Sequence, residues 1–167
     1  TWNQGLRWIE QQNPEAWVAI IDDDDEWLPN HIELCKAHST GNDAVISGIR
    51  TSSDGQFVED RIPSAIAQSD FFATNPGWQG SNTFARASKL LEAGGFDESL
   101  LCTHDRDLAI RCLELPEFRI GFTEQVTMIY HLEKSRDSLT MTGGSGKHTG
   151  LLQFHRKHFE RMTEEDE

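Results

Sequence analysis

The chain has 167 residues, 37% of them hydrophobic, which is enough for one domain with a core. Its formal net charge of -13 argues against nucleic acid and anionic membrane surfaces as partners, because such polyanions would be repelled. No stretch is long and apolar enough to predict a transmembrane segment, the opening residues do not predict a secretion signal, and the spacing of the three cysteines does not indicate a disulfide framework or a zinc site.

The first half of the chain alternates helix and strand signals. An amphipathic pattern that ends at Asn13-Pro14 predicts an opening helix. The apolar run at 16–21 has no alternation, as in a parallel strand buried on both faces, and four aspartates follow it. Further along, the patterns predict a helix from Pro29 to Gly41, a strand at 44–49, a hairpin turn at 53–55, and loops with one short helix at 57–75.

The second half continues in the same way. His148, His155 and His158 are interleaved with basic residues, which predicts a solvated helix face. The remaining predicted elements are a strand at 82–85, helices at 89–93 and 105–115, strands at 119–122 and 126–131, a glycine-rich loop at 141–150, a helix at 151–162 and an acidic tail at 163–167. The order of elements predicts an α/β fold with a partly parallel sheet.

The aspartate run at 22–25 is the strongest chemical signal. Clustered carboxylates repel one another unless a cation neutralises them, and oxygen ligands suit Mg²⁺ or Mn²⁺. Open α/β sheets bind ligands at the carboxyl ends of their strands, which is where this run falls. Two alternatives are a solvated acidic turn and a haloacid-dehalogenase-like phosphotransferase, whose first aspartate would be a nucleophile.

Three segments resemble motifs of the family 2 glycosyltransferases, which have the GT-A fold. Residues 21–29 (IDDDDEWLP) resemble the family's "hDxDDxWxP" signature. Residues 94–98 (GGFDE) match its G-G-F-D-E turn, and residues 104–111 resemble its E-D-x-D-L-x-x-R segment with His104 in place of the glutamate. Tyr130-His131 with Ser138-Leu139-Thr140 resembles a later strand and loop of the family.

The resemblance implies roles for particular residues. Asp22 and Asp23 would contact the sugar nucleotide, and Asp24, Asp25 and His131 would hold the metal, Mn²⁺ or Mg²⁺; the alternative for His131 is a hydrogen-bonded structural residue. Asp105 would be the general base that deprotonates the acceptor hydroxyl; the alternative for Asp105 is helix capping. Acceptor contacts would come from Trp78, Gly95, Phe96, Asp97 and His104, although core packing is an equal alternative for Trp78.

The resemblance also implies the overall organisation. We expect residues 1–140 to form the carboxyl-side portion of a GT-A-like domain with a mixed, mostly parallel sheet, followed at 141–167 by the loop, the helix and the tail. The family's opening nucleotide-binding strands have no counterpart, so the domain is expected to be N-terminally truncated, and the chain by itself is expected to have little or no transferase activity.

The implied activity is inverting, metal-dependent transfer from a nucleotide diphosphate sugar to the hydroxyl of a saccharide, lipid-linked or protein acceptor. Nucleotide sugars favour a cytoplasmic location, including the inner face of the membrane. A non-catalytic metal- or sugar-binding module is the alternative, and the sequence does not define an oligomeric state.

Overall fold

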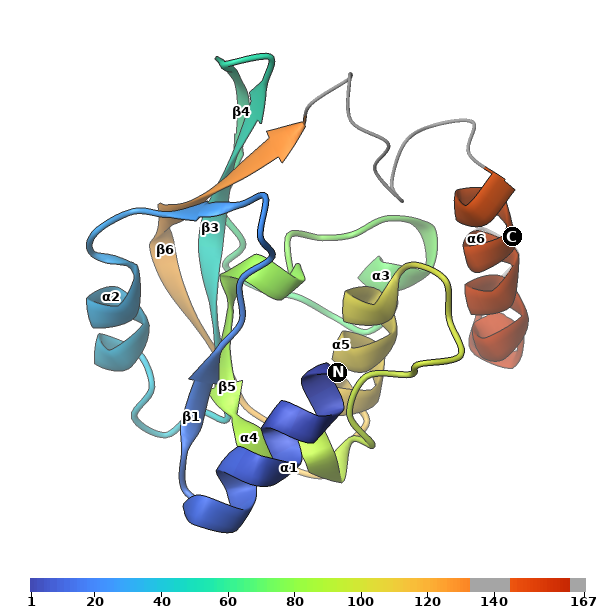
Figure 1. Ribbon diagram of the computed structural model, residues 1–167, viewed down its shortest axis with the longest axis horizontal. Coiled ribbons are helices and arrows are strands. Elements are labelled where there is room, and N and C mark those ends of the chain that lie inside the picture. Colours follow the sequence, from blue (N-terminus) through green and yellow to red (C-terminus); the bar gives the residue numbers. More distant parts are fainter. Residues whose placement is uncertain (133–144, 163–167) are drawn as a thin grey trace.

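A computed structural model of the chain describes residues 1–132 and 145–162 (Figure 1). The Ser138-Leu139-Thr140 segment and the tail at 163–167 lie outside the described residues. The helices are α1 (Trp2–Gln12), α2 (His31–Ala37), α3 (Asp70–Ala73), α4 (Ala87–Glu92), α5 (His104–Leu113) and α6 (Ser145–His158), with 3₁₀ turns η1 (Gly80–Asn82) and η2 (Phe159–Arg161). The strands are β1 (Trp17–Ala19), β2 (Glu26–Trp27), β3 (Ala44–Ser53), β4 (Gln56–Arg61), β5 (Thr83–Arg86) and β6 (Ile120–Leu132).

These strands form one mixed sheet in the order β1-β5-β3-β6-β2, with β4 paired to β3. The expected α/β fold with a mixed sheet is confirmed, but the expectation of a mostly parallel sheet is wrong. Only β3 and β6 pair in parallel, and all other pairs are antiparallel. The reason is that β5 lies between β1 and β3 and runs opposite to both, so β1 and β3, which share a direction, are not neighbours.

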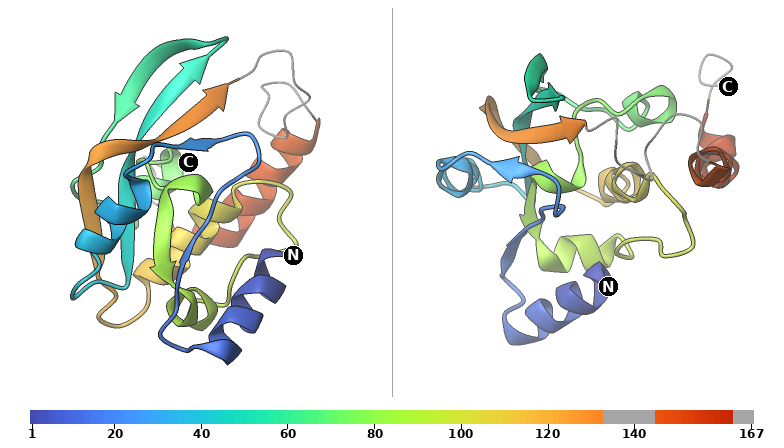
Figure 2. Two further views of the ribbon diagram at one scale, coloured as in Figure 1. Left: turned by 60° about the vertical axis from the view of Figure 1, so that its left-hand side comes forward. Right: turned by 45° about the horizontal axis from the view of Figure 1, so that its top comes forward.

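Helices cover both faces of this sheet unequally (Figures 1 and 2). The main core lies under α1, α4, α5 and α6 and includes Leu6, Ile46, Leu90, Ile110 and Phe154. On the other face, α2 contributes Cys35 to a small cluster with Val45 and Phe84. None of the helices in the described part of the chain is long and apolar enough to cross a membrane.

Several predicted elements differ in the structure. The predicted strands 119–122 and 126–131 form a single strand, β6. The register of its pairing with β3 shifts on both sides of Gly48. Gly48 lets the backbone of Gln125 come close, because a Cβ on Gly48 would lie 2.7 Å from the Gln125 carbonyl oxygen. Residues 57–61, the start of the predicted loops, belong to β4, an edge strand whose residues are all exposed and so lack a core-facing pattern. The turn before it is a hairpin, as predicted, with positive φ at Asp54 and Gly55.

The carboxyl-terminal helix begins earlier than predicted. Residues 145–150 belong to α6, so the predicted glycine-rich loop is wrong over that stretch. Gly150 meets a need for close packing, because a Cβ there would lie 2.5 Å from the Cys102 sulfur. His158 is fully buried, so the predicted solvated histidine face is also wrong for that residue.

Candidate functional site

The aspartate run lies where the chain leaves the carboxyl end of β1. Ile20 still donates its N–H to the Thr83 carbonyl of β5, and the run then turns, with the Asp25 N–H donating to the Asp22 carbonyl. The two-residue strand β2 follows and pairs with β6. The run is therefore anchored to the sheet on both sides.

Ser81 of η1 connects the two ends of the run. Its hydroxyl accepts a hydrogen bond from the Asp22 N–H (3.0 Å) and donates one to the Asp25 carboxylate (2.5 Å). The indole N–H of Trp27 donates to the Ser81 carbonyl (2.6 Å) and fixes η1 beside the run. The tryptophan of the motif at residues 21–29, Trp27, therefore holds η1 in place next to the aspartates.

Burial changes the proton affinity of this run. It raises the pKa of the Asp25 carboxyl to about 6, although the hydrogen bonds from Ser81 and from the His131 N–H act in the opposite direction. Burial, and next the negative charge of Asp24, also raise the pKa of Asp22. The run is thus electrostatically strained when all of its carboxylates are ionised.

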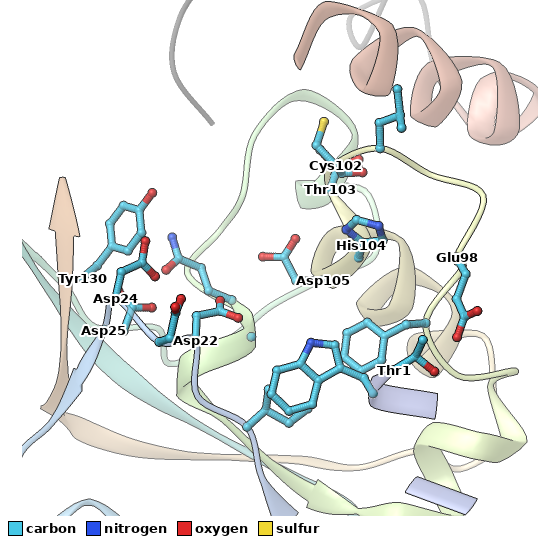
Figure 3. Close-up of a pocket in the computed structure, with 17 residues that line it drawn as sticks. Thr1, Asp22, Asp24, Asp25, Glu98, Cys102, Thr103, His104, Asp105 and Tyr130 are labelled. Atoms are coloured by element: carbon cyan, nitrogen blue, oxygen red, sulfur yellow. Dashed lines mark hydrogen bonds between the residues drawn. The ribbon is translucent and has the colours of Figure 1, made fainter. Parts of the chain in front are cut away.

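Asp105 lies in the first turn of α5, on the other side of the same cavity (Figure 3). Its carboxylate accepts hydrogen bonds from the Arg106 N–H (2.8 Å) and from the Asn75 side-chain amide (3.3 Å). Burial raises its pKa against the lowering effects of Arg106. Thr103, the residue before α5, adopts a left-handed backbone conformation (φ 63°). This conformation is unfavourable for a β-branched residue, and such strained residues cluster at functional sites.

One cavity of about 1040 Å³ joins these groups, which is large enough for a nucleotide sugar. Six carboxylates line it, namely Asp22, Asp23, Asp24, Asp25, Glu98 and Asp105. Among the described residues that line it there is no lysine or arginine. An anionic ligand would therefore meet a cavity of the same charge unless a cation accompanied it.

The structure brings together seven of the residues singled out in the sequence. The four aspartates of the run, Phe96, His104 and Asp105 all line the cavity. The Nε2 atom of His104 lies 2.7 Å from the Leu100 carbonyl oxygen, a contact that fixes its ring at the start of α5.

Four other residues singled out in the sequence do not line the cavity. Trp78 is 2% exposed and packs in the core against Phe71, so the core alternative holds for it. Gly95 is buried, and its carbonyl accepts a hydrogen bond from Arg111 (2.6 Å). Asp97 pairs with Lys157 (2.5 Å), and this hydrogen bond is the main reason that its pKa is lowered to about 2.

His131 is the fourth residue outside the cavity. Its ring lies 3.7 Å from the Glu26 carboxylate, and its backbone N–H reaches Asp25 at 3.4 Å. Tyr130 lines the cavity instead. Successive side chains of a strand point to opposite faces, so only one of these two neighbours can face the cavity.

Trp2 and Glu98, for which the sequence predicted no role, also line the cavity. Glu98 was visible as the last residue of the GGFDE segment, but Trp2 carried no local signal beyond its place at the start of a helix. Within residues 1–132 and 145–162, no group of three or more histidine, cysteine, aspartate or glutamate side chains is arranged to hold a metal ion.

Comparison with known proteins identifies the fold alone. No protein family matches the sequence, and no curated protein matches it. Among solved structures, TarS from S. aureus, in complex with UDP-GlcNAc, matches with a TM-score of 0.54 and 14% sequence identity. The match covers 96% of this chain and 52% of the TarS chain, so this chain spans about half the length of that structure. The chain therefore has a glycosyltransferase-like α/β fold.

Proposed function

We propose that the protein is a family 2 glycosyltransferase that transfers a sugar from a nucleotide diphosphate sugar to an acceptor hydroxyl, with inversion at the anomeric carbon. The observation that carries this proposal is the position of Asp105, which faces the aspartate run at 22–25 across one cavity of about 1040 Å³. The likeness of the fold to TarS, solved with UDP-GlcNAc, supports a nucleotide sugar as the donor.

The chemistry assigned to Asp105 is general base catalysis. Burial raises the pKa of its carboxyl, which makes the carboxylate a stronger base than an exposed aspartate. In the proposed step, Asp105 takes the proton of the acceptor hydroxyl while that oxygen bonds to the anomeric carbon. The bond from this carbon to the diphosphate oxygen breaks on the opposite face, and the diphosphate leaves with the electron pair.

Whether a divalent cation can bind at the aspartate run depends on the oxygen atoms that the run offers as ligands. The described protein groups do not form a complete metal site. Asp22 and Asp25 both lie at the Ser81 hydroxyl, and Asp24 lines the same side of the cavity. One or two carboxylates completed by substrate phosphates are the usual ligands of Mg²⁺, so these residues fit a cation that arrives with a diphosphate.

We therefore assign Asp24 and Asp25 to Mn²⁺ or Mg²⁺, with Asp22 and Asp23 nearest the nucleotide. When bound, such a cation would offset the charge that develops on the leaving diphosphate. The raised pKa values of Asp22 and Asp25 are consistent with a run that is most favourable beside positive charge. Location at the cytoplasmic side, where nucleotide sugars are made, remains part of the proposal.

The direct test is turnover of a donor. The 167-residue chain, by itself and joined to the nucleotide-binding half of a family 2 glycosyltransferase, is incubated with UDP- and GDP-sugars, beginning with UDP-GlcNAc, and release of the nucleotide diphosphate is measured with Mn²⁺ and with EDTA. From the joined chain we expect Mn²⁺-dependent release that Asp24→Asn abolishes and that Glu33→Gln leaves intact, since Glu33 is exposed on α2. Binding of UDP and Mn²⁺ without any release from the full donor panel would favour a non-catalytic binding module.

A further inference from the structure

Two aromatic residues, the half-exposed Trp2 and the partly buried Phe96, line the same cavity as Asp105. The rings of Trp2 and Phe96 lie 6.4 Å apart with an interplanar angle of 36°, and both residues line the cavity. Trp2 is 50% exposed. A half-exposed indole inside a cavity offers an apolar surface that a ligand can cover.

The position of this pair is fixed by Asn3. The side-chain amide of Asn3 donates to the Phe96 carbonyl (2.8 Å) and accepts from the Phe96 N–H (2.7 Å), so it holds the backbone of Phe96 in the manner of a strand neighbour. Gly95 allows this approach, because a Cβ there would lie 2.5 Å from the Asn3 oxygen. The fold therefore does not need the exposed face of Trp2 to hold α1 against this turn.

Polar groups surround the aromatic pair. The Asn3 amide also donates to the Glu98 carboxylate (3.0 Å), which orients Glu98 beside the pair. Figure 3 shows Glu98 and Thr1 on the side of Asp105 that is opposite to Asp24 and Asp25. Carboxylates only accept hydrogen bonds, so they suit a ligand that carries hydroxyl donors. A phosphate placed at Glu98 would be repelled, whereas a neutral sugar would not.

We propose that Trp2 and Phe96, with Glu98, form an acceptor subsite that binds a saccharide. One apolar face of a sugar ring stacks on the indole, and its hydroxyl groups donate to Glu98, so that another hydroxyl is presented to Asp105. This inference rests on the proposed function for the direction of transfer, but the subsite itself is a binding site with its own test. In this proposal the tryptophan that stacks on the sugar ring is Trp2, and not the buried Trp78.

The test follows the indole N–H signals of the ¹⁵N-labelled chain by NMR. Methyl glycosides of glucose, galactose and N-acetylglucosamine are the neutral probes. Trp8 is the matched control, because it lies on the same helix, is 64% exposed and does not line the cavity. The Trp2 and Trp8 signals are assigned with the variants Trp2→Phe and Trp8→Phe.

We expect at least one glycoside to shift the Trp2 indole signal saturably and to leave the Trp8 signal in place. Trp2→Ala should weaken that binding about tenfold, followed at the Phe96 amide, whereas Trp2→Phe should retain part of it and Trp8→Ala all of it. A Trp2 signal that no glycoside shifts would overturn the proposal. So would a Trp2 signal that responds to UDP and not to glycosides, because the indole would then stack on the nucleobase.

Failure of this subsite and failure of the proposed function can be told apart in the same spectra. UDP with Mn²⁺ should shift the Asp24 amide whether or not the aromatic pair binds sugar. If UDP with Mn²⁺ shifts the Asp24 amide signal but no glycoside shifts the Trp2 indole signal, the subsite is contradicted and the proposed function is not.

Discussion

The buried carboxylate of Asp107 lies 3.0 Å from Nε2 of His158, which is 51 residues further along the chain. Arg111 and Lys157 also contact this carboxylate, each at 2.6 Å. Burial alone would raise the pKa of Asp107, but these hydrogen bonds reverse the effect and hold it well below the ordinary range. The resulting cluster joins α6 to α5, two residues after Asp105.

Removal of this buried charge should destabilise the fold. Asp107→Asn leaves Arg111 and Lys157 without their buried anion, and we expect a loss of about 3–5 kcal/mol in the free energy of unfolding, measured with urea. Asp97→Asn is the matched control: its pair with Lys157 is partly exposed and screened by solvent, so the loss should stay below about 2 kcal/mol. Equal losses in the two variants would contradict the importance of the buried cluster.

Two glycines of α6 should respond oppositely to the same substitution. Among the described residues outside α6 itself, no atom lies within 4 Å of the position that a Cβ would take at Gly146, so Gly146→Ala in the first turn should raise stability by up to about 0.5 kcal/mol through helix propensity. Gly150→Ala should lower it, because the new Cβ would lie 2.5 Å from the Cys102 sulfur. Thermal unfolding of both variants checks this, and two stabilising substitutions would show that α6 does not pack closely on Cys102.

The sequence predicted which residues meet at the cavity better than it predicted how the core packs. The aspartate run and Asp105 could be placed because each begins or ends a regular element, and the carboxyl ends of strands are where open sheets bind ligands. Trp2 and Trp78 could not be told apart, because exposure depends on contacts far away in the chain. His158 gave a misleading signal for the same reason, since its partner Asp107 is on another helix. The place of β5 between β1 and β3 has no local signature either.

The pKa of Asp25 predicts how stability varies with pH in the metal-free protein. The folded-state pKa is about 6 and the ordinary value is 3.8, so the folded protein keeps a proton that the unfolded chain loses between these values. The Asp25 contribution to the free energy of unfolding therefore falls as pH rises from about 4 to 6. Asp25→Asn should remove this fall and stabilise the protein at pH 7 by about 1–3 kcal/mol.

Chemical denaturation at a series of pH values tests this effect, with Glu33→Gln as the charge-matched control. The profile of Asp25→Asn should diverge from that of the wild type above about pH 4. Parallel profiles over the whole range would mean that Asp25 does not hold its proton more tightly in the folded state.

Metal and nucleotide should bind cooperatively. The described protein groups supply an incomplete set of ligands, so Mn²⁺ alone should bind weakly, and UDP should tighten its binding about tenfold or more. Linkage requires Mn²⁺ to tighten UDP by the same factor. Calorimetric titration in both orders measures this, and Asp24→Asn should remove the coupling. Independent binding of the two ligands would contradict a shared site at the run.

The proposed function depends most on Asp105 as the base. The measurement that isolates this role compares turnover by Asp105→Asn with the binding of UDP and Mn²⁺ by the same variant. Asparagine keeps the shape of the side chain but cannot take the acceptor proton. We predict that nucleotide diphosphate release from the donor falls by about 10²–10⁴-fold while the affinity for UDP with Mn²⁺ stays at its wild-type value. Undiminished release, or an equal loss of release and of binding, would contradict the assignment of Asp105.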